Sequence, residues 1–355
     1  MKIAITVSSI TPGSGLSKYI LTLIKILNVN RNEIFVITTH GKDDVYEKSQ
    51  VQQCANIKYY SLGKNSKLQK YFTAIRLLRD LQPDVIINNY NAVFQYILPF
   101  ISHKTKVVHI IHNNTEDFYR IAAINARYVH GWIAPTPALV NYFNEYTTSR
   151  YTAKIKYIPH GVEDGINRTQ RNINKTELSF VGVHYEHKGV LVLPPIIKQL
   201  KEKGLDFHFN IVGKGKLTDN IKEQLKDEIE KGEVTFTGVI SPEEVYQIQS
   251  QTDIFVYPTH IDAFGLVIAE AMINGAVPVV TLLPGITDEL VEEGKNGFLV
   301  VQDDVDAFVE NIYLLATNRE LLARMSEDAI ERAKTRFSLD VMQKNYLNYL
   351  EDIVK

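Results

Sequence analysis

Short apolar segments alternate with segments of helical periodicity along most of the 355-residue chain. This alternation is typical of β-α-β units, whose strands form a parallel sheet. One helix face is predicted by apolar residues that recur three or four positions apart, namely Leu16, Tyr19, Ile20, Leu23, Ile24 and Leu27. In the first half, strand-like segments occur at residues 3–7, 34–38, 85–88, 107–111, 132–135 and 155–158.

The alternation is interrupted once and then resumes. Residues 159–176 are polar, contain glycine and lack a clear period, which is typical of a linker. Helical patterns run from residue 305 to the end. We therefore predict the α/β fold class, with two Rossmann-like domains that face each other across a cleft and bind ligands at the carboxyl ends of their strands. The strand-like segments of the second half are residues 178–183, 207–212, 234–237, 254–257, 278–281 and 298–301.

Charge, cysteine content and hydropathy narrow the range of partners and compartments. The net charge of −2 offers no argument for nucleic acid, and we expect no such partner. The single cysteine, Cys54, excludes an internal disulfide and suits a reducing compartment. The first residues lack the features of a signal peptide, and no apolar stretch has the length of a membrane span. We therefore expect a cytoplasmic protein.

Two glycine-containing turns join strand-like segments to the helices expected after them. Ser14 and Gly15 form one, and Gly213 belongs to the other, where lysines add positive charge. Glycine lets the backbone approach a ligand, and a helix N-terminus favours an anion. For the first turn an ordinary tight turn is an equally good explanation. The G-x-G-x-x-G spacing of a dinucleotide site is absent.

Histidine and lysine residues follow strand-like segments at the same expected edge. His112 comes directly after residues 107–111 and is a candidate catalytic residue. His109 points to the opposite face, where a packed and hydrogen-bonded histidine is the commoner arrangement. Lys188 stands at the expected start of a helix, where it would neutralise a diphosphate as a point charge. The alternative for Lys188 is a solvated surface residue.

The sequence offers no metal-ligand motif. It contains no H-E-x-x-H pattern and no cysteine and histidine cluster. Asp304 and Asp306 form a D-x-D, but they directly precede a helical pattern and are better explained as N-cap and first-turn acids. We therefore predict that no metal and no cofactor is required.

Two carboxylates flank a Phe-Gly step after residues 254–257. Asp262 is predicted in a loop, and Glu270 within a helix that ends near Asn274 and Gly275. A buried mid-helix glutamate needs donors, which ribose hydroxyls would supply, and Asp262 would accept from sugar hydroxyls. The alternative is a structural glutamate and a capping aspartate. Backbone amides suited to a diphosphate lie at the helix start, at Phe264, Gly265, Leu266 and Val267.

Residues 258–279 resemble the signature of the retaining GT-B glycosyltransferases, also called group 1 or family 4, in which two acids flank Phe-Gly and Glu-Ala-x-x-x-Gly-x-Pro-Val follows. The resemblance covers nearly the whole chain. It departs from the family pattern at Val183, where the family has an arginine, at Asp262, which replaces a glutamate, and at Ser14, which replaces a glycine. Further matching segments are Ser14-Gly15, His112-Asn113 and residues 158–163, 212–215 and 285–300.

The resemblance implies transfer of a sugar from a nucleotide diphosphate sugar to the hydroxyl of a glycan or lipid-linked acceptor, with retention at the anomeric carbon. It implies a role in bacterial-type surface glycan or glycolipid assembly. The N-terminal domain, residues 1–163, would bind the acceptor, and the C-terminal domain, residues 164–337, the donor. A last helix, residues 338–355, is expected to pack back on the first domain. The sequence does not decide whether the nucleotide of the donor is UDP or GDP.

The same resemblance implies a role for each candidate residue. Lys188 and the helix amides would stabilise the diphosphate, and Glu270 would hold the ribose. Asp262 would hold the donor sugar, and His112 would face that sugar near its anomeric carbon. The glycine-containing turns at Ser14, Gly15 and Gly213 would lie against the donor.

Two kinds of alternative function stay open. An inverting transferase or a sugar epimerase uses the same fold with different stereochemistry. A catalytically silent subunit that binds glycan or partners a transferase is the non-enzymatic alternative, and Val183 and Asp262 are its best support.

Residues 63–80 form a basic segment of helical periodicity. Five basic residues stand against the single acid Asp80, and Leu68, Tyr71, Phe72, Ile75 and Leu78 recur at helical spacing. One interpretation is a surface helix whose apolar face packs on the first sheet. The other is that the basic face docks on anionic lipid at the inner face of the plasma membrane, which would make the protein a peripheral membrane protein.

Overall fold

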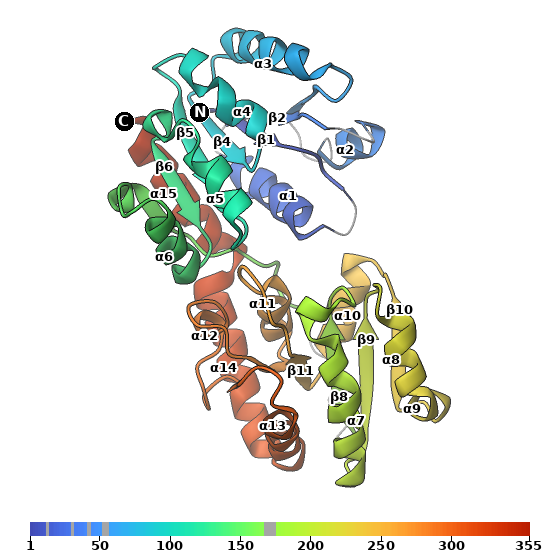
Figure 1. Cartoon of the computed structure of the whole chain (residues 1–355). Helices are drawn as coiled ribbons and strands as arrows, with labels where there is room; N and C mark the ends of the chain where they lie inside the picture. The colour runs from blue at the N-terminus through green and yellow to red at the C-terminus, as the bar shows by residue number, and fades with distance from the viewer. Residues whose placement is uncertain (12–13, 30–31, 41–43, 52–56, 167–174) are drawn as a thin grey trace. The chain divides into compact units, whose positions relative to one another are not determined.

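The computed structural model describes residues 1–11, 14–29, 32–40, 44–51, 57–166 and 175–355. These residues form two compact units (Figure 1). The first contains residues 1–161 and 339–355, and the second contains residues 162–338. Cys54, Pro12, Gly13 and much of the predicted linker lie outside the described residues.

The first unit is built on a sheet of seven parallel strands in the order β3-β2-β1-β4-β5-β6-β7. The central strands are almost wholly apolar, as expected for a parallel sheet covered on both faces. The strands are β1 (Lys2–Val7), β2 (Glu33–Thr38), β3 (Ile57–Ser61), β4 (Val85–Asn89), β5 (Lys106–Ile110), β6 (Gly131–Ala134) and β7 (Ile155–Tyr157).

Helices cover both faces of this sheet. One face packs against α1 (Gly15–Leu27) and against the last helix, α15 (Leu339–Val354), in a single apolar core. The other face packs against α3 (Lys67–Leu81) and α4 (Ala92–Ile97). The remaining helices of the unit are α2 (Asp44–Val51), α5 (Glu116–Ala123), α6 (Pro137–Tyr146), η1 (Leu98–Phe100), η2 (Ala126–Tyr128) and η3 (Thr152–Lys154).

Helix α1 shows why the apolar pattern specifies the fold. Its predicted apolar face is the face that packs on the sheet, because Tyr19, Ile20, Leu23, Ile24 and Leu27 are all buried. Each large apolar side chain that leaves water contributes about 1.5–3 kcal/mol. Tertiary packing of this stripe, rather than capping, therefore stabilises the helix, since the side chain at the N-cap position makes no capping hydrogen bond.

The second unit has a sheet of six parallel strands in the order β10-β9-β8-β11-β12-β13. One continuous apolar core joins the sheet to its helices. The strands are β8 (Thr176–Val181), β9 (Phe207–Val212), β10 (Val234–Gly238), β11 (Ile254–Tyr257), β12 (Val277–Thr281) and β13 (Phe298–Val300). The helices are η4 (Glu186–Lys188), η5 (Val190–Val192), α7 (Leu193–Glu202), α8 (Thr218–Gln224), α9 (Lys226–Glu230), α10 (Pro242–Gln251), α11 (Leu266–Ile273), α12 (Thr287–Leu290), α13 (Val305–Thr317) and α14 (Arg319–Phe337).

The predicted α/β fold with two Rossmann-like domains is confirmed, and every predicted strand-like segment overlaps a strand. The pattern missed β3, an edge strand that mixes apolar, aromatic and polar residues and whose side chains are mostly half-buried. The expected helix at Lys188 was wrong. This residue ends the short turn η4, and α7 begins only at Leu193, next to Pro194. Among the helices of the described ranges, none has the length and apolar character needed to cross a membrane.

Candidate active site

Lys188 and Asp262 form an ion pair at the carboxyl edge of the second sheet. The Lys188 Nζ lies 2.8 Å from Asp262 Oδ2, and both side chains are only 17% exposed. The same carboxylate oxygen accepts from the Tyr257 hydroxyl at 2.9 Å. Lys188 Nζ also donates to the carbonyl oxygen of Ile261 at 3.2 Å. The ammonium group is therefore held at one defined position rather than moving freely in solvent.

The other carboxylate oxygen of Asp262 closes the turn that leads into α11. Oδ1 accepts from the backbone amides of Ala263 at 2.8 Å, Phe264 at 3.2 Å and Gly265 at 3.1 Å. Five donors thus converge on one side chain. Burial raises the pKa of Asp262, but the nearby charge and hydrogen bond of Lys188 outweigh burial and bring the pKa below its ordinary value.

These hydrogen bonds decide which amides at the start of α11 stay available. The amides of Phe264 and Gly265, which we expected to face a diphosphate, donate to Asp262 instead. The first N–H groups of a helix have no partner within the helix. The donors that helix geometry leaves for a ligand are therefore those of Leu266 and Val267, in the first turn of α11. Gly265 has a φ of 90°, so a side chain there would strain the backbone.

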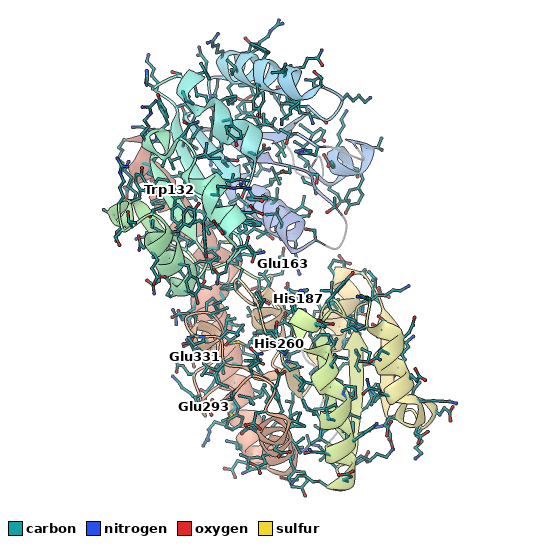
Figure 2. The ribbon with its side chains drawn as sticks, viewed as in Figure 1. Trp132, Glu163, His187, His260, Glu293 and Glu331 are labelled. Carbon is teal, nitrogen blue, oxygen red and sulfur yellow. The ribbon has the colours of Figure 1, made fainter. Side chains whose placement is uncertain are left out.

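The loop that carries Lys188 is fixed against the end of β11. Gly189 has a φ of 65°, and a Cβ atom there would lie 1.7 Å from the carbonyl oxygen of Pro258. The His187 carbonyl accepts from the amide of His260 at 3.0 Å and from that of Ile261 at 3.3 Å. His187 and His260, labelled in Figure 2, mark these two loops. The distance from Lys188 to Asp262 thus depends on backbone contacts as well as on the ion pair.

Glu270 is buried in the middle of α11, with 3% of its surface exposed. Burial raises the pKa of Tyr246 well above its ordinary value, and the charge of Glu270 raises it further. The carbonyl oxygen of Glu270 accepts from the side chain of Asn274 at 2.8 Å. Asn274 in turn accepts from the amide of Ile166 at 2.9 Å. A buried acid thus lies on the same helix whose first turn has two amides without a partner inside the helix.

The glycine turn after β9 is required by close backbone contacts. Gly213 has a φ of 118°, and an added Cβ atom would lie 1.9 Å from the carbonyl oxygen of Gly182. At Gly215 the corresponding atom would lie 2.4 Å from the carbonyl oxygen of His184. The glycines therefore let the loops after β8 and β9 touch. Val183, in the first of these loops, is 44% exposed and carries no charge.

His112 lies at the carboxyl end of β5 in the first unit. Its Nε2 lies 3.0 Å from Asn89 Oδ1, and the Asn89 amide nitrogen donates to the Ile87 carbonyl, which orients that oxygen toward the histidine. Burial lowers the pKa of His112 well below its ordinary value, and His160 and His109 lower it further. The imidazole is therefore neutral at neutral pH, with the proton on Nε2 and a lone pair on Nδ1.

A tyrosine pair supports His112. The ring of Tyr19 on α1 packs edge-on against His112 at a centroid distance of 4.8 Å and is tilted against His160 at 4.6 Å. The hydroxyl of Tyr19 lies 2.5 Å from that of Tyr346 on α15. Both tyrosines are almost fully buried. The last helix of the chain thus fixes the ring that packs on the histidine.

His109 is a buried structural histidine, as its position within a strand predicted. Its Nδ1 lies 3.0 Å from Gln95 Oε1 and 3.4 Å from Asn88 Nδ2. Burial lowers the pKa of His109 to about 3. It therefore stays neutral and satisfies a polar network beneath the strand ends.

At the start of α1, Ser14 is the N-cap residue, but its side chain makes no capping hydrogen bond. A Cβ atom at Gly15 would meet nothing within 4 Å. Packing within the described residues therefore does not explain the glycine at position 15.

The D-x-D was predicted to be a helix cap, and the structure confirms this. Asp304 Oδ1 accepts from the amide of Ala307 at 3.0 Å, at the start of α13. Asp306 accepts from the side chain of Gln199 at 2.9 Å. Within the described part of the chain, no three histidine, cysteine, aspartate or glutamate side chains gather as a metal site would require. Independence from metal stays a prediction.

Sequence reasoning missed the three tyrosines and the asparagine that hold these candidate residues. Tyr257 is the last residue of β11, Asn89 is the last of β4, and Tyr19 and Tyr346 lie on apolar helix faces. Tyr257 and Asn89 could have been found from the sequence, because each places a polar atom at the end of a buried strand. No local signal marks the tyrosine pair, because its members are 327 positions apart.

Comparison with known families agrees with this arrangement. The family described as "Glycosyl transferases group 1" matches residues 163–332, and "Glycosyltransferase Family 4" matches residues 13–165. The two family models together match residues 13–332, so the chain belongs to the glycosyltransferases of group 1 and family 4. The resemblance inferred from the sequence motifs is therefore confirmed, as is the GT-B fold.

Individual relatives match different fractions of this chain. An uncharacterized glycosyltransferase of Haemophilus influenzae is 32% identical over 163 residues, which is 45% of each chain. The alpha-monoglucosyldiacylglycerol synthase of Streptococcus pneumoniae is 23% identical over 96% of this chain and 86% of its own. Among solved structures, Anabaena HepE in complex with UDP and glucose is 19% identical, with a TM-score of 0.80 over 99% of this chain and all of its own.

Proposed function

We propose that this glycosyltransferase is a retaining enzyme, which moves a sugar from a nucleotide diphosphate sugar to an acceptor hydroxyl. The observation that carries the proposal is the ammonium group of Lys188, fixed by Asp262 at the N-terminus of α11. In the reaction, the bond between the anomeric carbon and the diphosphate breaks and a bond to the acceptor oxygen forms on the same face. The acceptor proton leaves on the departing diphosphate.

The second unit is proposed to bind the donor. Lys188 and the amides of Leu266 and Val267 would face the diphosphate, where a fixed cation and a helix N-terminus stabilise the negative charge that grows as the bond breaks. Glu270 would accept from the ribose hydroxyls, and the turn at Gly213 would lie against the nucleotide. The protein then supplies charge and position, and no side chain attacks the sugar.

The role of Asp262 follows from its hydrogen bonds. Its two oxygens already accept from Lys188, Tyr257 and three amides. A direct hydrogen bond from the donor sugar to Asp262 would have to compete with these N–H and O–H groups of the protein. We therefore propose that Asp262 is mainly a positioning residue, which fixes the cation and orients the start of α11.

The first unit is proposed to bind the acceptor and to present His112 to the sugar. A neutral imidazole that donates through Nε2 to Asn89 keeps a lone pair on Nδ1. The lone pair on Nδ1 can accept a hydrogen bond from a sugar hydroxyl, or it can face the partial positive charge near the anomeric carbon. Ser14 and Gly15, at the start of α1, would lie near the donor.

The acceptor class rests on the relatives. One relative is named as a synthase of a glucosylated diacylglycerol, and HepE was solved with UDP and glucose. We propose a UDP-linked or GDP-linked hexose as the donor and a glycan or lipid-linked acceptor in bacterial-type surface glycan or glycolipid assembly. The catalysis is proposed to need no metal, because Lys188 and the helix amides supply the positive charge.

The test is a panel of UDP and GDP sugars offered to the purified protein, with nucleotide release measured with and without candidate acceptors. The proposal expects one donor to bind and to be consumed, slowly by water and faster with an acceptor. An epimerised donor would indicate an epimerase on this fold. If no nucleotide sugar binds, the silent-subunit alternative holds, and the exposed Val183 in place of a cation would explain it.

A further inference from the structure

Helix α3 exposes two large apolar side chains that its periodicity had assigned to the packed face. Ala74 and Leu78 are buried against the sheet. Leu68 and Phe72 lie one turn apart and are 70% and 73% exposed. The expectation that they pack on the first sheet was therefore wrong. Apolar side chains that gather on a surface mark an interaction site.

The neighbouring helix extends this exposed apolar surface. Tyr96 at the end of α4 is 50% exposed, and Phe100 in η1 is 61% exposed. The ring of Tyr96 contacts that of Tyr71 on α3, at a centroid distance of 6.3 Å. Helix α3 lies alongside α4 (Figure 1). We call Leu68, Phe72, Tyr96 and Phe100 the apolar patch.

Basic side chains lie on the same segments as the apolar patch. Residues 63–84 carry five basic residues and two acidic residues, Asp80 and Asp84. Asp80 is paired with Arg76 at 3.9 Å, and Asp84 accepts from the amide of Lys2 at 2.7 Å. Exposed cations lie along α3, in the turn before it and in the loop after η1, at Lys64, Lys67, Arg76, Arg79 and Lys104, and Arg76 is the one that pairs with Asp80.

A pocket beside the patch combines both properties. Its volume is about 450 Å³. Apolar walls come from Ile75 of α3 and Ile101 after η1, and cations from Arg79 and Lys104. One acid, Asp84, also lines the pocket, and its carboxylate accepts from the amide of Lys2. A phosphate group with the first part of an acyl chain has the matching chemistry. The pocket also shows that α3 and the loop after η1 form one continuous surface.

We propose that this face of the first unit docks on the surface of a bilayer that contains anionic phospholipid. Aromatic and aliphatic side chains enter the boundary between headgroups and acyl chains, and basic residues on the same segments attract the anionic headgroups. Each basic residue near such a surface strengthens binding by about fivefold. The excess of basic residues on this face complements the negative charge of the bilayer surface. The candidate active-site residues of the first unit, Ser14, Gly15 and His112, lie on other elements than those proposed to dock.

Vesicle sedimentation with the full chain tests the proposal. The vesicles are either pure phosphatidylcholine or equal parts of phosphatidylcholine and phosphatidylglycerol. Wild type is expected to sediment with the anionic vesicles at low salt, to be released as salt rises, and to bind pure phosphatidylcholine only weakly. Changing Lys64, Lys67 and Arg76 together to Glu is expected to weaken binding by about a hundredfold or more.

Two further variants separate docking from general charge and from folding. The matched control changes Lys198, Lys226 and Lys231, exposed in the second unit, to Glu, and is expected to bind like wild type. Phe72→Ser keeps every charge, and its exposed position predicts an unchanged melting temperature, yet it is expected to lose most binding. Wild type that stays in the supernatant with anionic vesicles at low salt overturns the proposal. So does a wild-type dimer that Phe72→Ser converts to monomer, because the face would then join two copies of the chain.

Discussion

The Lys188 ammonium and the Asp262 carboxylate lie 2.8 Å apart, although 74 positions separate them in the chain. The contact joins the loop after β8 to the loop after β11, two strands that pair in the sheet. It brings a cation to the first turn of α11. The proposed chemistry depends on this placement.

Replacing Lys188 with Ala is expected to lower turnover more than donor affinity. The charge on the leaving diphosphate grows as the bond breaks, so the cation matters most in the transition state. Loss of one such stabilising group costs about 10²–10³-fold in turnover. Steady-state kinetics against Lys198→Ala, an exposed lysine on α7, checks this. A fall in donor affinity with unchanged turnover would show that Lys188 stabilises the bound donor and the transition state equally.

The low pKa of Asp262 predicts an acid-dependent loss of stability. Burial opposes ionisation, but Lys188 brings the folded-state pKa below the ordinary value of about 3.9. The ionised carboxylate therefore stabilises the fold above that ordinary value, and the contribution is lost as pH falls through the folded pKa. Thermal melts of wild type and Asp262→Asn should differ most near neutral pH and converge as the pH falls below the ordinary carboxyl pKa of about 3.9 and through the lower folded-state pKa. A difference that grows with acidification would contradict this assignment.

Glu270→Ala is expected to remove most nucleotide binding, because a buried carboxylate is proposed to accept from both ribose hydroxyls. Titration calorimetry with UDP and GDP measures the loss, and Glu310→Ala on α13 is the control. Since Glu270 is buried, the melting temperature must be compared as well. A folded variant with wild-type nucleotide affinity would refute the ribose role.

The hydroxyl pair of Tyr19 and Tyr346 predicts coupled mutants. Either single change to Phe leaves one buried hydroxyl without its partner, at a cost of about 1–3 kcal/mol in the free energy of unfolding. The double change removes both groups, so its cost should fall below the sum of the single costs. Denaturant unfolding of all four proteins gives the cycle. Strictly additive costs would show that the hydroxyls do not interact.

Turnover is expected to survive a chelator. Lys188 and the amides of Leu266 and Val267 are proposed to supply the positive charge that a metal supplies elsewhere. Assays with and without EDTA, after dialysis of the protein, test this directly. Complete loss of activity that manganese or magnesium restores would overturn the proposed charge distribution.

The sequence predicted the periodic parts of this fold well. The apolar runs located the strands, and Asn274-Gly275 located the end of α11, because these signals act over a few residues. It failed where a contact with a distant segment decides the structure. Gly189 ends the turn at Lys188 because its backbone packs on Pro258, and no neighbouring residue reports that contact.

The candidate site shows the same limit. Motif spacing found Lys188, Asp262 and Glu270, but not that Asp262 takes the amides of Phe264 and Gly265 for itself. On α3, helical spacing grouped Leu68 and Phe72 with the buried residues, whereas the sheet reaches only the part of the helix around Ala74 and Leu78. Periodicity gives the direction of a side chain, but not whether another element covers it.

The central claim is retaining sugar transfer, and proton NMR of the reaction tests it most directly. The donor found in the nucleotide-sugar panel is incubated with its acceptor, and the anomeric coupling constant of the first product formed is compared with that of the donor. Retaining transfer predicts the same anomeric configuration in both, and loss of the product signal in Lys188→Ala. A product with the inverted configuration would contradict it.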